Sequence, residues 1–182
     1  MIGKVVGHFK TITKHKILVM KYCFRVGLYK QGILHDFSKY MPTEFLVGCR
    51  YYQGTRSPNN AEREVKGYSA AWLHHKGRNK HHFEYWIDYS LKMGKTPMEG
   101  MKMPRKYVAE MLIDRIAASK VYNGNSYTNH DSLAYYLRGK QHYMMHPETA
   151  KQLEALLRIL DEAGEDVLFR YVKKVFLRGK QV

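Results

Sequence analysis

The chain has 182 residues, of which 31 are lysine or arginine and 16 are aspartate or glutamate, so its formal net charge is +15. This length predicts one domain with its own core, and the positive charge favours anionic partners such as nucleic acid, nucleotides or phosphorylated metabolites. No apolar run approaches the ~20 residues that a membrane span needs, and the N-terminus MIGKVVGHFK lacks the features of a signal peptide. We therefore expect a soluble, cytoplasmic protein with no membrane partner.

The hydrophobic period is helical along the first half of the chain. Residues 3–30 predict one long helix that Gly32 breaks. Its apolar stripe recurs at steps of three and four residues and comprises Ile12, Leu18, Val19, Tyr22 and Val26. Pro42 suits the first turn of a second helix that reaches about Tyr52, and QGTRSPNN at 53–60 is a loop by composition. A third helix is predicted from Pro58 to His75.

Further helices follow in the second half. The segment KGRN at 76–79 interrupts the pattern, and Asn79 is a suitable N-cap for a helix that carries HHFEYWIDYSLKM at 81–93. After a connection at 94–104, Pro104 opens a helix over RKYVAEMLIDRIAASKVY, which Asn123-Gly124 ends. We expect the last helices at about 131–145, from Pro147 to about Ala163, and from Glu165 to about Leu177.

No strand run, hairpin turn or internal repeat is visible in the sequence. The predicted class is therefore all-α, with residues 1–182 forming a single helical bundle of about six to eight helices. The helices at 147–178 are expected to pack on the rest. Cys23 and Cys49 have no CxxC spacing and apolar neighbours, which predicts buried free thiols in a reducing cytosol.

Histidine and carboxylate residues are grouped along the chain rather than spread evenly. His8 and His15 are seven residues apart and share a helix face, and His35 precedes Asp36. Four histidines fall within nine residues: His74, His75, His81 and His82. Downstream, Glu110 and Asp114 lie four residues apart on one helix. Imidazole combined with carboxylate suits zinc, iron, manganese or cobalt better than calcium or magnesium.

Several of these residues also have a structural interpretation. His8 is typical of a surface or partly buried helix residue, and His15 suits a hydrogen-bonded core histidine. On a helix, only one member of each histidine doublet can face a given point. Asp114, however, lies among apolar residues in EMLIDRIAA, where a carboxylate needs a partner or a metal. Taken together, the residues favour a metal site.

A second HD dipeptide, His130-Asp131, shows that this dipeptide alone is a weak signal. It follows the loop NGNSYTN, so Asp131 is better interpreted as a helix cap.

The order His15, His35-Asp36, the two histidine doublets and Asp114 resembles the HD-domain metal-dependent phosphohydrolase superfamily. That superfamily is all-helical and binds one metal through an early His, the HD doublet and a late Asp, while members with extra histidines bind two. More closely, the chain resembles a family of small bacterial and phage proteins of unknown function. The motifs are HDxSK, here HDFSK at 35–39, and WxHHxxRNxHHxEYW, here WLHHKGRNKHHFEYW at 72–86. This resemblance covers roughly residues 8–155.

The resemblance implies a site for one or two divalent ions, of iron, manganese or zinc. The implied ligands of the first ion are His15, His35, Asp36 and Asp114. With two ions, Asp36 would bridge them, and one of His74/His75 and one of His81/His82 would complete the second. Which member of each doublet binds stays open. Lys39 takes the place of a lysine that often follows the doublet in the superfamily, and Lys39, Arg78 and Arg115 are expected to face phosphate oxygens.

A divalent ion lowers the pKa of bound water from about 15.7 toward ~7 and supplies hydroxide. The expected function is therefore hydrolysis of a phosphate ester, such as a nucleotide, in which Asp36, Lys39 and Arg78 act in catalysis. One alternative is a non-haem di-iron or di-manganese redox enzyme that handles oxygen or peroxide. Another is a nucleic-acid-binding module with structural histidines and a basic track from Lys10 to Lys30. A homodimer also stays open.

Overall fold

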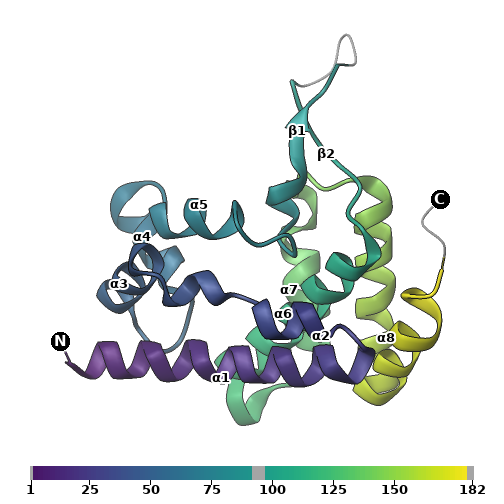
Figure 1. The fold of residues 1–182 in the computed structure, drawn as a ribbon, viewed down its shortest axis with the longest axis horizontal. Coiled ribbons are helices and arrows are strands. Elements are labelled where there is room, and N and C mark those ends of the chain that lie inside the picture. Colours follow the sequence, from purple (N-terminus) through teal and green to yellow (C-terminus); the bar gives the residue numbers. More distant parts are fainter. Residues whose placement is uncertain (1, 92–96, 180–182) are drawn as a thin grey trace.

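The computed structural model describes residues 2–91 and 97–179, and these residues are mostly helical (Figure 1). The α-helices are α1 (Ile2–Val26), α2 (Tyr29–Leu34), α3 (Pro42–Tyr51), α4 (Pro58–Lys66), α5 (Ala70–Lys76), α6 (Arg105–Asn123), α7 (His130–Gly139) and α8 (Pro147–Tyr171). Short 3-10 helices lie at η1 (Phe37–Tyr40), η2 (Phe83–Trp86), η3 (Gly124–Ser126) and η4 (Lys140–His142), and α8 continues into a π-turn, η5 (Val172–Phe176). The predicted all-α class is confirmed.

Two short strands, β1 (Ile87–Tyr89) and β2 (Met98–Gly100), pair antiparallel with Ile87 opposite Gly100. They project as an arm from the helical body (Figure 1). The helix predicted over residues 81–93 is therefore wrong within the described part of that segment, where a 3-10 turn and a strand replace it; residues 92 and 93 lie outside the described residues. The aromatic and β-branched residues of YWIDY favour a strand, and pairing with Met98–Gly100 outweighs their weak helical pattern.

The core forms around α6, which is buried on several sides. Its buried residues include Val108, Leu112, Ile113 and Ile116. They pack between the apolar stripe of α1 and a leucine-rich face of α8, comprising Leu153, Leu156, Leu157 and Leu160. Full burial of such a side chain stabilises the fold by about 1.5–3 kcal/mol. The same helix carries Glu110 and Asp114, so the best-packed element of the core positions two carboxylates.

The first predicted helix is wrong at its C-terminal end. α1 ends at Val26, and Gly27 takes the left-handed conformation with φ +87°, as glycine does after many helices. Gly32, expected to break the helix, instead lies inside α2. A Cβ atom on Gly32 would be 2.9 Å from the Cβ atom of Cys23. Glycine at position 32 therefore lets α2 fold back closely against α1.

The helix predicted from Pro58 to His75 is two helices. α4 ends at Lys66 because Gly67 is left-handed with φ +79°. The Ser69 hydroxyl then caps α5 by accepting a hydrogen bond from the Trp72 amide. Asn79 caps no helix, since its amide donates to Ser38 Oγ and to the carbonyl of His75. These turns hold α5 and the histidine segment beside α3.

Near the C-terminus, α7 ends at Gly139 rather than at 145, and a 3-10 turn follows. Asn129 is the N-cap of α7, while Asp131 accepts a hydrogen bond from the Thr128 amide, so its predicted role as the cap is wrong. α8 consists of two helical segments that meet at a kink at Gly164, whose backbone angles are not helical (φ +78°, ψ 175°). This kink falls at the predicted boundary between the last two helices.

Cys23 and Cys49 are buried and free, as predicted. Among the described residues, no helix has an apolar stretch long enough to cross a bilayer.

Candidate metal centre

The His35-Asp36 doublet lies where the chain leaves α2. His35 has non-helical backbone angles (φ −51°, ψ 128°), and Asp36 is left-handed with φ +52°. It is the one non-glycine residue with positive φ in the described ranges 2–91 and 97–179. Strained conformations of this kind occur often at functional sites. Because the backbone turns here, His35 Nε2 lies 3.4 Å from Asp36 Oδ2, whereas adjacent residues on a helix would diverge.

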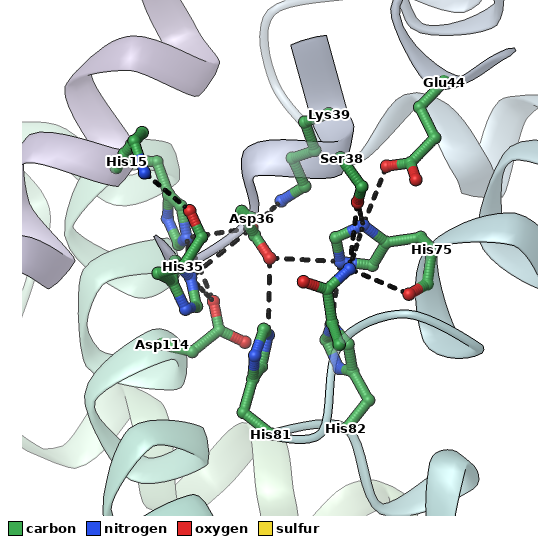
Figure 2. Close-up of polar contacts among 12 residues, drawn as sticks. His15, His35, Asp36, Ser38, Lys39, Glu44, His75, His81, His82 and Asp114 are labelled. Carbon is green, nitrogen blue, oxygen red and sulfur yellow. Dashed lines mark hydrogen bonds and ion pairs between the residues drawn. The ribbon is translucent and has the colours of Figure 1, made fainter. Parts of the chain in front are cut away.

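The first group of converging atoms joins α1, the doublet and α6 (Figure 2). His15 Nε2 lies 3.0 Å from Asp114 Oδ1 and 3.6 Å from Asp36 Oδ2. His35 Nε2 lies 3.3 Å from His15 Nε2 and 3.5 Å from Asp114 Oδ1. One ligand atom from each of these four residues lies within 4.8 Å of all the others, a spacing that suits ligands about 2 Å from one ion.

The second group shares Asp36 with the first and adds three histidines. His75 Nε2 and His81 Nε2 lie 3.2 Å and 3.4 Å from Asp36 Oδ1, and His82 Nε2 lies 2.9 Å from His75 Nε2. Here too, the four ligand atoms lie within 4.8 Å of one another. Asp36 thus directs Oδ2 to the first group and Oδ1 to the second, the arrangement of a bridging carboxylate.

Both members of the His81-His82 doublet reach the second group. The expectation that only one can face it assumed a helix, but residues 81 and 82 lie in a turn before η2. In the other doublet, only His75 takes part. His74 Nδ1 instead contacts Glu44 Oε1 at 2.6 Å, and its ring belongs to neither group.

Two buried glutamates contact the Nδ1 atoms of histidines in the two groups. Glu110 Oε1 lies 3.0 Å from His35 Nδ1 and 3.2 Å from His81 Nδ1. Glu44 Oε2 accepts from His75 Nδ1 at 2.8 Å. Such contacts place the ring proton on Nδ1 and leave the Nε2 lone pair directed inward, as around metal-bound histidines. Glu44 was missed in the sequence, where an acidic residue after Pro42 gives only a helix-start signal; Glu110 was visible through its spacing to Asp114.

The electrostatics of the cluster also favour a bound cation. His75 Nε2 lies 2.9 Å from His82 Nε2, so two potential ligand nitrogens converge at this point. Both Asp36 oxygens and His81 Nε2 are buried without a well-oriented hydrogen bond. Burial raises the pKa of Asp36, but His35, Lys39 and His75 outweigh it and hold that pKa well below its usual value. The donor set therefore comprises ionised carboxylate and inward-facing imidazole nitrogen, which suits iron, manganese or zinc.

The pKa values of two histidines of the cluster shift in opposite directions. Burial lowers the pKa of His82 well below the usual value, with His81 and His75 adding to the effect. For His35, burial acts in the same direction, but the carboxylates of Asp36, Asp114 and Glu110 outweigh it and raise the pKa.

A cavity of about 790 Å³ opens onto both groups. Ligand residues on its wall are His15, His75, His82 and Asp114. Its cationic residues are Lys39, Arg56, Arg63, Arg115 and Arg138, and its aromatic residues include Tyr52, Trp72, Tyr122, Tyr135 and Tyr143. Lys39 Nζ lies 2.5 Å from Asp36 Oδ2. An anionic molecule with an apolar part would suit these walls.

Three other residues considered in the sequence lie apart from the two groups. Arg78 is exposed, donates to the carbonyl of His74 at 3.3 Å, and is not on the cavity wall. His8 is buried on that wall. His130 is exposed and contacts Asp161.

Comparison with known proteins gives one family match. The model of a family of unknown function, DUF5662, matches residues 4–159, a range that contains every residue of both groups. No curated protein and no solved structure matches the chain.

Proposed function

Because the chain belongs to the DUF5662 family, whose function is unknown, we propose an activity from the site itself: metal-dependent hydrolysis of a phosphate ester. The observation that carries this proposal is Asp36, which directs one oxygen to each of two groups of nitrogen and oxygen atoms. Pairs of metal ions clamp both oxygens of an in-line displacement in many phosphatases and nucleases. The cationic cavity beside the groups supports an anionic substrate.

Seven residues would hold the ions. His15, His35 and Asp114 would take the first with Asp36 Oδ2, and His75, His81 and His82 the second with Asp36 Oδ1. Such ions supply hydroxide from water near neutral pH. The order of these residues along the chain, with its resemblance to HD-domain phosphohydrolases, supports the same chemistry.

The remaining site residues would position these ligands and the substrate. Glu44 and Glu110 orient three of the imidazoles. Lys39 contacts the bridging carboxylate and lies on the cavity wall, from which its ammonium group can reach a phosphoryl oxygen. Arg78 lies away from the cavity, so we assign it no part in catalysis.

The test begins with metal content per chain, measured by elemental analysis of untagged protein purified with and without air. We expect about two ions of iron, manganese or zinc. The loaded protein should hydrolyse p-nitrophenyl phosphate, bis-p-nitrophenyl phosphate or a nucleotide, and Asp36→Ala should lose both activity and metal. Protein that stays free of metal after reconstitution with each ion would overturn the proposal.

A redox enzyme is the second candidate, because five imidazoles and two carboxylates without a cysteine also suit paired iron. Two irons per chain, with consumption of oxygen or peroxide and no hydrolysis, would favour it. The nucleic-acid-binding alternative has less support. Its proposed track includes Lys16, whose ammonium group instead donates to the carbonyls of Ile33 and His35 and so holds the metal-site backbone.

A further inference from the structure

Arg115 follows the ligand Asp114 on α6 and lies on the wall of the same cavity. Its guanidinium carbon is 5.8 Å from the centre of the Tyr136 ring and 5.6 Å from that of Tyr143. Its Nε atom is buried and has no hydrogen-bond partner. The side chain thus lies over two neighbouring aromatic rings, and one of its strong donors has no partner.

Three other arginines of the described residues pair with a carboxylate. Arg56 forms a bidentate ion pair with Glu64, with both hydrogen bonds at 2.6 Å. Arg25 pairs with Asp166, and Arg158 pairs with Glu154. Among the residues that the structure describes, Arg115 forms no ion pair with a carboxylate. Glu84 also lies on the cavity wall but forms no ion pair with Arg115. Burial raises the pKa of Glu84, and the positive charge of Arg115 offsets part of that rise.

A partly buried cation without a counter-charge is costly. A bound anion would supply the missing counter-charge. A guanidinium suits this role because its five donors form a rigid fork that matches phosphate. Contacts with aromatic faces keep that fork in place before the ligand arrives, which reduces the ordering cost of binding. Arg115 therefore has the chemistry, the position and the free donors of an anion-binding residue.

We propose that Arg115 binds an anionic oxygen of the phosphoryl group that the two metal groups hold. This inference rests on the proposed function, because it takes the cavity as the substrate site. Of the two arginines expected to face phosphate oxygens, Arg115 lies on the cavity wall and Arg78 does not. The substrate then contacts the metal side and a fixed guanidinium at once, which favours ligands that carry a phosphate over uncharged molecules of the same size.

The experiment measures the affinity of inorganic phosphate for the metal-loaded protein by calorimetry. Arg115→Met should weaken phosphate binding about tenfold or more, as expected for loss of a charge-assisted contact, without changing the metal content. Arg138→Met is the matched control: Arg138 lies on the same cavity wall and packs on Tyr135, but it is exposed. Screening by water and salt should limit the effect of the control to about twofold.

Arg115→Gln provides a second variant if the methionine variant does not fold, since it retains a polar group and removes the charge. Unchanged phosphate affinity in a folded Arg115 variant would overturn the inference, as would an equal loss in Arg138→Met. The two proposals can fail separately. If the protein hydrolyses phosphate esters but phosphate affinity does not depend on Arg115, only the role of the arginine is refuted. If phosphate binds through Arg115 but no ester is hydrolysed, only the catalytic function is refuted.

Discussion

Asp36 combines a left-handed backbone, burial of both carboxylate oxygens and contacts to both metal groups. Asparagine tolerates the same backbone conformation and has nearly the same volume. It lacks the negative charge and replaces one acceptor with a donor. Exchange of this one residue therefore tests the bridge with little disturbance of the fold.

We predict that Asp36→Asn loses both ions and keeps its helical content. The measurements are metal per chain and far-ultraviolet circular dichroism. Asp131→Asn, in the other HD dipeptide, is the control and should keep the metal content of the wild type, because Asp131 contacts only the residues before α7. Two ions retained in Asp36→Asn would rule out the bridging role.

The two histidines of the first doublet make a matched pair for the second group. His75→Ala should remove one ion per chain, because His75 Nε2 faces Asp36 and His82. His74→Ala should keep both ions, since its ring contacts only the outer glutamate Glu44 through Nδ1. Elemental analysis of the two variants decides which member binds, and equal metal loss in both would contradict the assignment.

Glu110 tests the outer support of the ligands. We predict that Glu110→Gln weakens metal binding about 10–100-fold, a usual effect of losing the carboxylate behind a metal-bound histidine. Competition with a chelator of known affinity measures the change. Glu64→Gln, on the exposed ion pair with Arg56, is the charge-matched control and should leave metal affinity unaltered.

At the scale of elements, the helices with continuous periodic patterns were predicted best. The helix opened by Pro104 was predicted almost to the residue, and Gly164 marks the kink where two helices were predicted. The segments near the histidines were predicted less well. Residues 81 and 82 lie in a turn. His81 Nδ1 contacts Glu110 Oε1 on the distant helix α6, a tertiary contact that no local period reveals.

The site residues too were predicted where the sequence motif relates them, and missed where their placement depends on tertiary structure. His15, His35, Asp36 and Asp114 were predicted because the motif order relates them, and the structure brings them together. The participation of both His81 and His82 was not predicted, because it depends on the turn. Arg115 lies within a regular helix, where only the tertiary arrangement shows that it has no acidic partner while Arg56 has one.

The contact between α1 and α3 is a close one at Gly48. A Cβ atom there would lie 2.1 Å from His8 Nε2. We predict that Gly48→Ala destabilises the protein by about 1–3 kcal/mol, the usual cost of overpacking, measured by urea unfolding. Gly3→Ala is the control, because nothing lies within 4 Å of a Cβ atom at Gly3.

A double variant separates this clash from other effects. His8→Ala removes the ring that the new methyl group would meet, so His8→Ala/Gly48→Ala should be less destabilised than the sum of the two single variants. Strictly additive losses would show that the ring does not cause the effect.

At the scale of the whole molecule, the ligands join parts of the chain that are far apart in sequence. α1, the end of α2, α5, the turn at 81–82 and α6 meet at Asp36 (Figure 2). An ion that binds only the folded chain stabilises it by mass action. The gain is about 4 kcal/mol when the free ion concentration is a thousand times the dissociation constant. The ions of the proposed function should therefore contribute to stability across the domain.

We predict that removal of metal with a chelator lowers the thermal midpoint of the wild type, and that re-addition of the ion restores it. The same treatment should leave the midpoint of Asp36→Asn unchanged, because that variant has no ion to lose. Scanning calorimetry makes the comparison. An equal shift in both proteins would mean that the chelator acts elsewhere.

The order of ligands along the chain has a consequence for biosynthesis. The last residue of the second group along the chain is His82, whereas the first group is complete only when Asp114 has been synthesised. During synthesis from the N-terminus, the histidine-rich half-site therefore leaves the ribosome before α6, which brings Asp114 and the supporting Glu110. A nascent chain thus presents these imidazoles before the helix that would complete the proposed site. For the proposed ions, we therefore expect that the metal supplied during translation affects which ion binds.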